Sequence, residues 1–317
     1  MNFRSFFFLV FCLFLNLPGF AQQPDTTAYK GVAAVVFLDS FVVTAKRQGF
    51  NPEEFIQYVL EDESFYKAFQ NLRRVSYEAE NEITLFNRKG GVKADYSSKT
   101  KQVSDGRCRS MEFLEQKDSG KFFKRKNREY KYYTAKLFDR IFYTHGTICE
   151  TKQTKPSHLS EISPPKGKIE KHIFELKKLI FQPGMKADVP VIGGKTAIFS
   201  EKMQPFYNYS LLSKDYKGID CYAFIASPKH EYEEDDTVVK YMETFFEKSN
   251  FQVIARNYWL KYSGALFSFD VKMKVRLTKR GDMYLPQHIE YEGFWDIPMK
   301  AAERAKFKTK FSDFKIP

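Results

Sequence analysis

The sequence has few of the residues that usually build active sites and metal centres. It contains five histidines and four cysteines, and they form no HExxH, HxH or CxxC arrangement. No GxSxG or Walker-type glycine loop is present. The acidic run EYEEDD, residues 231–236, lacks the glycine and spacing of an EF-hand and is interpreted as a turn. These patterns select no catalytic residue, metal ligand or cofactor, so we expect a protein that is not an enzyme.

Long apolar runs are also missing after residue 21. No later stretch of about 20 residues is free of charges, as a membrane-spanning helix would require. Met1 to Ala21 differs, because Arg4 is its only charge and a run of apolar residues follows. This pattern predicts a secretory signal peptide cleaved near Ala21 and a periplasmic protein, with outer-membrane association left open. The alternative, a membrane anchor, conflicts with Asn16 and Pro18, which interrupt the apolar run.

Acidic residues are too few to balance the basic ones. The chain has 51 Lys and Arg against 39 Asp and Glu, a net charge of +12. Such a balance favours anionic partners, and for an exported protein we expect lipid head groups, acidic glycans or an acidic protein face, and not nucleic acid. The alternative is that the charge only keeps the surface soluble.

Cysteine usage leaves the redox state open. Cys108, Cys149 and Cys221 lie beyond the predicted signal peptide. One disulfide and one free thiol can form in an oxidising compartment, but the sequence does not choose the pair. Three reduced, buried cysteines are the alternative.

What the sequence does have is long alternation of apolar and charged residues. Residues 265–277 alternate over thirteen positions, which predicts a half-buried strand roughly 44 Å long that must twist and curve. Residues 288–295 alternate again on the return. For the two apolar faces to coincide we expect a three-residue loop of Arg280, Gly281 and Asp282, which would set Lys272 opposite Glu290.

Further strands and several helices complete the pattern. Strands are predicted at residues 77–85, 219–226 and 305–316, the last with a bulge near Ser312 and Asp313, and a hairpin is predicted around residues 248–250. Helical periodicity predicts one helix that begins at Asn51 and three more at residues 65–72, 134–142 and 168–182. We therefore expect an α+β fold, predominantly antiparallel β, in which a long curved meander sheet has helices covering its apolar face.

The order of these segments resembles the LolA-like family of periplasmic lipoprotein and lipid carriers. The resemblance lies in FIQYVLEDESFYKAFQNLRRVSYEAENEITLF, YKGIDCYAFIASPK, NFQVIARNYWL, DMYLPQHIEYEG and FSDFKI, and it covers about residues 51–116 and 204–316. It implies a half-barrel that binds an acyl chain in an apolar cavity without chemistry. The chain departs from the family at an insertion, about residues 117–203, and at an extra strand, residues 32–45, which leaves the cargo open.

Three segments follow from this reading. They are a signal peptide (1–21), an N-terminal segment with one strand (22–50) and a LolA-like half-barrel domain (51–317) that contains the insertion or lid. Within the second segment, LDSFVVTAK also resembles a strand of outer-membrane receptors energised through TonB, and such a strand can extend a partner's sheet. The alternative is an ordinary strand of the domain.

Two sets of residues are candidate binding surfaces. The apolar lining of the half-barrel is predicted to be Phe267, Phe269, Met273, Ile289, Tyr291, Trp295 and Phe307. The alternative is that the helices fill this space and leave a packed core. A membrane or anion surface is predicted within KFFKRKNREYKYY, at Phe122, Phe123, Lys124, Arg125, Lys126 and Arg128. The alternative there is a solvated hairpin whose basic residues guard a sheet edge.

Two functions therefore stay open. In the first, the protein holds a lipid or an acylated protein in the half-barrel. In the second, it is an envelope interaction module with a filled core, which docks an outer-membrane or other envelope protein through its basic face or N-terminal strand. The oligomeric state is not predicted by either.

Overall fold

The computed structural model describes residues 59, 62–149, 183–187, 192–265, 267–297 and 300–317. All of them belong to the unit Ala33–Pro317, one of the two into which the chain divides. The predicted signal peptide, the strand at 32–45 and the helices at Asn51 and at 168–182 lie outside the described residues, and these predictions stand untested.

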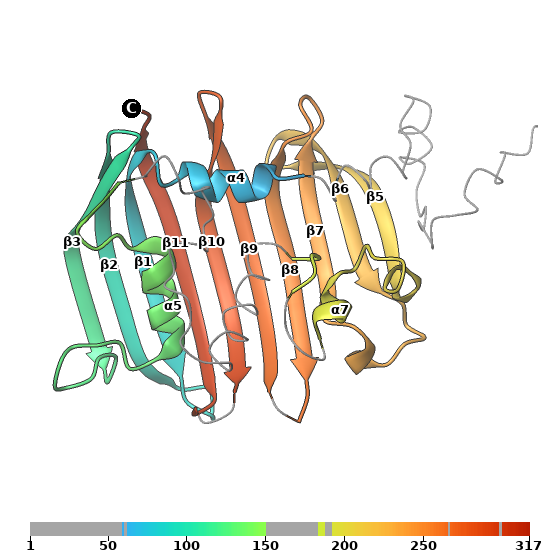
Figure 1. Ribbon diagram of the computed structural model, residues 1–317, viewed down its shortest axis with the longest axis horizontal. Helices are drawn as coiled ribbons and strands as arrows, with labels where there is room; N and C mark the ends of the chain where they lie inside the picture. Colours follow the sequence, from blue (N-terminus) through green and yellow to red (C-terminus); the bar gives the residue numbers. More distant parts are fainter. Residues whose placement is uncertain (1–58, 60–61, 150–182, 188–191, 266, 298–299) are drawn as a thin grey trace, which may run out of the picture. The chain divides into compact units, whose positions relative to one another are not determined.

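Eleven antiparallel strands form one sheet in the order β4-β3-β2-β1-β11-β10-β9-β8-β7-β6-β5 (Figure 1). Their bounds are β1 Ser76–Phe86, β2 Val92–Ser104, β3 Cys108–Gly120, β4 Thr147–Cys149, β5 Tyr207–Tyr216, β6 Ile219–Pro228, β7 Val239–Glu247, β8 Val253–Ser263, β9 Ser268–Arg280, β10 Met283–Asp296 and β11 Glu303–Lys315. The sheet is thus two meanders, β1–β4 and β5–β11, joined where β1 pairs with β11. This curved, open meander confirms the predicted fold class.

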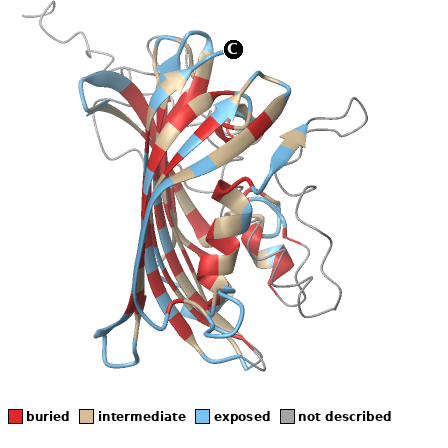
Figure 2. Cartoon of the chain, turned by 90° about the vertical axis from the view of Figure 1, so that its left-hand side faces the viewer, coloured by how far each residue is buried: buried red, intermediate tan, exposed pale blue. Residues whose placement is uncertain are grey.

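Short helices lie on one face of this sheet, called the inner face below (Figure 2). They are α4 Ser64–Asn71, α5 Tyr133–Phe142 and α7 Gly193–Thr196, and the 3₁₀ turns are Gln204–Phe206 and Glu234–Asp236. Helix α4 buries Phe65, Ala68 and Phe69, as its apolar stripe predicts. Helix α5 corresponds to the helix predicted at residues 134–142.

Strand alternation separates an apolar inner face from a charged outer face. In β9, Phe269, Val271 and Met273 are buried while Lys272 and Lys274 are exposed. On the outer face, charges of opposite sign face each other across neighbouring strands. One such row is Lys274 of β9, Glu290 of β10, Lys308 of β11 and Glu82 of β1. This part of the outer face therefore carries alternating charges and is not uniformly basic.

The loop between β9 and β10 corrects one prediction. Arg280 pairs directly with Met283, which leaves a two-residue turn, and Gly281 takes the positive φ of 56° that such a turn requires. The odd residue that aligns the two apolar faces comes instead from a bulge between Pro286 and His288. A bulge fits this position because proline has no N–H to donate to the ladder. As a result Lys272 faces Glu292, and Glu290 faces Lys274.

The bulge predicted near Ser312 and Asp313 is confirmed. In β1, Ser76 faces Lys315 and Glu78 faces Ser312. One residue therefore lies between the two positions in β1 and two lie between them in β11, so β11 carries one extra residue. Asp313 takes a positive φ of 52° there.

A disulfide joins Cys108 to Cys149 and ties β4 to the start of β3. The disulfide decides which two of the three cysteines pair, which the sequence had left open. Cys221 is a buried free thiol that donates to the Ile219 carbonyl over 3.2 Å. Burial raises the pKa of this thiol to about 11, with the nearby carboxylate of Asp220 acting in the same direction.

Candidate binding site on the inner face of the sheet

A continuous row of aromatic rings crosses the inner face from β9 to β11. The ring of Phe269 lies 5.2 Å from that of Trp295, whose indole Nε1 donates to Tyr291 Oη over 2.7 Å. Tyr291 stacks on Phe307 at 4.5 Å between centroids. Helix α5 covers Phe307 with Phe138, which makes an edge contact at 5.1 Å. We call Phe269, Trp295, Tyr291 and Phe307 the aromatic row.

Six of the seven predicted lining residues are buried on this face. Besides the aromatic row, Ile289 is fully buried, and the sulfur of Met273 accepts a hydrogen bond of 2.8 Å from Tyr258. Phe267 is only half-buried at the end of the row, 6.4 Å from Phe269 between ring centroids. The structure therefore brings the set together as a packed surface, and the two cavities described below are lined by other residues.

Gly293 makes room within this row. Its neighbours at i−2 and i+2, Tyr291 and Trp295, point to the same face, and the Tyr291 ring folds over the Gly293 backbone. A Cβ at this position would collide with the Tyr291 hydroxyl and ring. Glycine is therefore needed here for close approach and not for an unusual φ.

The β1–β11 side of the inner face also carries buried polar groups. Asn81 donates to Ser98 Oγ over 3.2 Å, and Ser98 shares a 2.6 Å hydrogen bond with the Tyr143 hydroxyl. Asn81 faces Thr309 across the strands, and Asn81 Oδ1 and Thr309 Oγ1 are buried without a hydrogen-bond partner in the described chain. The inner face is thus apolar along the aromatic row and polar beneath the end of α5.

A carboxylate of the sheet holds the start of α5. The helix begins after Tyr132, whose side chain cannot cap it. Glu303, at the first position of β11, supplies the cap: Tyr133 N–H donates to Oε2 over 3.1 Å, and Thr134 N–H donates to Oε1 over 2.8 Å. A negative charge at a helix N-terminus is favourable, so Glu303 both orients α5 and fixes it over β11.

The basic run before α5 folds into a tight hairpin, with Phe123 paired to Tyr130. This corrects the membrane-surface prediction at Phe122, which is 0% exposed and stacks on Tyr96 at 5.0 Å, so its ring cannot reach a membrane. Phe123 is half-buried under the guanidinium of Arg128, 4.9 Å away. Lys124 pairs with Glu129 over 2.9 Å. Arg125 and Lys126 are exposed at the tip.

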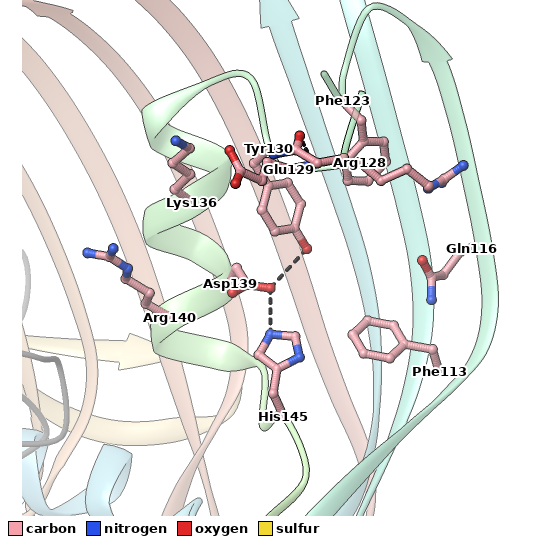
Figure 3. Close-up of a pocket in the computed structure, with 11 residues that line it drawn as sticks. Phe113, Gln116, Phe123, Arg128, Glu129, Tyr130, Lys136, Asp139, Arg140 and His145 are labelled. Atoms are coloured by element: carbon pink, nitrogen blue, oxygen red, sulfur yellow. Dashed lines mark hydrogen bonds and ion pairs between the residues drawn. The ribbon is translucent and has the colours of Figure 1, made fainter. Parts of the chain in front are cut away.

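The hairpin, β3 and α5 border an open cavity of about 640 Å³ (Figure 3). Its lining residues are Phe113, Gln116, Phe123, Asn127, Arg128, Glu129, Tyr130, Lys136, Asp139, Arg140 and His145. At its centre, Asp139 Oδ1 accepts 2.9 Å hydrogen bonds from the Tyr130 hydroxyl and from His145 Nε2. Burial, and next the Asp139 charge, raise the pKa of Tyr130, which therefore stays a neutral donor.

A second cavity, of about 310 Å³, lies at the N-terminal end of α5 and is called the lysine cavity below. It is lined by Leu85, Phe86, Lys93, Lys131, Tyr132, Tyr133, Lys136, Lys300, Ala301, Ala302 and Glu303. Lys136 of α5 lines both cavities, so the two lie next to each other at this helix.

Sequence reasoning missed Asp139, His145 and Glu303 as site residues. Asp139 lies on a predicted helix and His145 follows it by six positions, a spacing that belongs to no recurring motif. Glu303 begins an alternating strand and faces inward among apolar residues. Glu303 is a charged residue at one of the alternate positions of that strand that are otherwise mostly apolar, and this is the one signal that could have identified it.

Among the described residues, no group of three or more His, Cys, Asp or Glu side chains could hold a metal ion. Within the same part of the chain, no helix is both long enough and apolar enough to cross a membrane.

This chain is similar to three solved structures. No protein-family model and no curated protein sequence matches the chain. A DUF1329 family protein from Desulfovibrio piger has 13% identity and a TM-score of 0.24, with 80% of this chain and 92% of that one covered. A putative outer membrane lipoprotein-sorting protein domain from Vibrio parahaemolyticus has 9% identity and a TM-score of 0.26, with 79% and 92% covered.

A third solved structure, a LolA superfamily protein from Nitrosomonas europaea, has 11% identity and a TM-score of 0.22, with 80% and 93% covered. At these TM-scores the similarities assign no function to this chain, and its fold class rests on its own strand order and register. The name of this third structure is that of the family that the sequence resembles.

Proposed function

We propose that this protein is an exported binding protein that holds the acyl part of a lipid or an acylated protein against the aromatic row, without chemistry. The observation that carries the proposal is the row itself, which spans three strands of the inner face and is covered at Phe307 by the ten-residue helix α5. Two cavities border the same helix, although neither is lined by a residue of the row.

An acyl chain can take the place of two α5 side chains on the row. Phe138 and Phe142 of α5 lie over Phe307 at 5.1 and 6.1 Å between ring centroids. An acyl chain on the same rings would gain about 0.8 kcal/mol for each buried CH₂. A long acyl chain can therefore compensate for the contacts that these two displaced side chains would lose.

Export belongs to the same proposal. The Cys108–Cys149 disulfide supports a compartment outside the cytosol, because disulfides persist in oxidising environments such as the periplasm.

The two tryptophans provide the test, because they lie on opposite faces. Trp295 is in the aromatic row, whereas Trp259 lies across from Lys272 on the outer face and donates to Asp270 over 2.7 Å. Trp259→Phe and Trp295→Phe each leave one fluorophore, since the chain has two tryptophans. A brominated fatty acid quenches tryptophan on contact. We expect it to quench Trp295 at about one ligand per protein and to leave Trp259 unquenched.

Equal quenching of both tryptophans would mean adsorption to the surface, and no quenching of Trp295 would mean that the inner face stays closed. Either result would contradict the proposal and favour the interaction module with a filled core. Mass spectrometry of protein purified from an envelope fraction without detergent gives an independent readout, and we expect a co-purified acyl species that solvent extraction removes.

A further inference from the structure

We propose that the lysine cavity is a binding site for an anionic group, a phosphate or a carboxylate, and that it selects the head group of the ligand. The inference rests on the proposed function, which supplies the acyl part of the ligand, and it adds the chemistry of the head group.

The first argument is the charge around the cavity. Four lysines line it and Glu303 is the only carboxylate that does so. In the described chain, no salt bridge involves Lys93, Lys131, Lys136 or Lys300. A small cavity with this excess of ammonium groups attracts an anion and repels a cationic head group, whereas a neutral head group gains no such attraction.

The single carboxylate does not neutralise the lysines. Glu303 is buried and uses both oxygens to accept hydrogen bonds from the backbone N–H groups of Tyr133 and Thr134. Its charge is therefore directed at the positive end of α5.

Two of the ammonium groups lie near the Tyr132 ring. The Nζ atoms of Lys93 and Lys131 lie 5.3 and 5.7 Å from the centroid of that ring. Both lysines also line the cavity, so an anion held there would be attracted by both charges. The Tyr132 hydroxyl is itself buried without a hydrogen-bond partner in the described chain, which leaves a donor unused beside the cavity.

Tyr133 places the cavity next to the aromatic row. Tyr133 lines the cavity and its hydroxyl donates to the Trp295 carbonyl over 3.3 Å. Leu85 and Phe86 supply an apolar wall at the same place. A head group held by the lysines would therefore lie at one end of the surface on which we place the acyl chain. This arrangement suits an anionic amphiphile.

The test compares three probes on the full chain after the predicted signal peptide: inorganic phosphate, a lysophosphatidic acid and a monoacylglycerol with the same acyl chain. The cavity variant is Lys93→Gln with Lys131→Gln. The matched control is Lys274→Gln with Lys310→Gln, which removes the same charge from exposed positions of the outer face. Melting temperatures confirm that both variants fold.

We expect the unaltered protein to bind the phosphorylated probe at least tenfold more tightly than the neutral one. The cavity variant should lose that preference, whereas the control variant should keep it. Equal affinity for both acyl probes would overturn the anion site while leaving the proposed function intact. So would an equal loss in both variants, because it would indicate only the net charge. Binding of phosphate that depends on Lys93 and Lys131, without binding of either acyl probe, would support the anion site and contradict the proposed function.

Discussion

At the scale of single residues, burial decides the chemistry of Cys221. Its thiol lies in the sheet and donates to a backbone carbonyl, and burial raises its pKa to about 11. An ordinary cysteine has a pKa of about 8.5, so the folded protein keeps the reactive thiolate scarce at pH 8. Because the folded pKa is raised, the stability from this group is present below about pH 8.5 and is lost as pH rises toward 11.

We expect an alkylating reagent at pH 8 to leave the folded protein unmodified over minutes. In denaturant without reductant, one thiol of the chain that follows the predicted signal peptide should react, and with reductant three should react, because Cys108 and Cys149 form a disulfide. Peptide mass spectrometry gives the count. Rapid alkylation of Cys221 in the folded protein would contradict its burial.

At Gly293, the addition of one methyl group should disturb the packing. Gly293→Ala should lower the free energy of unfolding by about 1–3 kcal/mol, because the new methyl group must push the Tyr291 ring off the backbone. Gly194→Ala is the control, since no atom lies within 4 Å of the position its Cβ would take. Urea denaturation measures both. A Gly293→Ala protein as stable as the control would mean that Tyr291 does not pack over this backbone.

At the scale of secondary-structure elements, helices α4 and α5 are held by charged groups from elsewhere in the chain. Near the start of α4, Arg256 of β8 is buried, with its Nη2 3.9 Å from Asp62 and its guanidinium 4.4 Å above the Phe65 ring. Burial lowers the pKa of Arg256, and Asp62 opposes that shift. Helix α5 depends on Glu303 in the same way.

Removing the cap of α5 should loosen that helix alone. Glu303→Ala leaves two N–H groups of the first turn without their acceptor and should cost about 2 kcal/mol. Hydrogen exchange should show faster exchange in residues 133–142 with little change in β9 and β10. Glu82→Gln, an exposed carboxylate of β1, is the control and should leave α5 protected. Unchanged exchange in α5 of Glu303→Ala would rule out the capping role.

At the scale of the whole sheet, the outer face is organised by rows of opposite charge across strands. Lys308 lies between Glu290 of β10 and Glu82 of β1. Such pairs favour the native register, because a one-residue slip would place these charges on the buried face.

Lys308→Glu should therefore lower the free energy of unfolding by about 1 kcal/mol at low salt, since two attractive neighbours become repulsive. At 1 M salt the loss should nearly vanish, because screening shortens the reach of charges to about 3 Å. Lys308→Gln should fall between the two proteins. A loss that did not depend on salt would point to packing and not to charge.

Local patterns determined most of the sheet and part of the inner face. Period-two alternation placed the long strands β9 and β10 and put the aromatic row on one side, because successive side chains of a strand must point to opposite faces. Parity required one odd residue between β9 and β10, but whether a loop or a bulge supplied it depended on the pairing at Pro286. The predicted signal peptide and the N-terminal strand stay predictions.

Only the tertiary structure decided which distant residues meet. The pairing of β1 with β11, the Cys108–Cys149 disulfide and the cap that Glu303 places on α5 each join segments far apart in the chain. The lysine cavity is likewise assembled from β1, β2, α5 and the start of β11. No local pattern could specify these contacts, because periodicity reports the face on which a residue lies and not the partner that covers it.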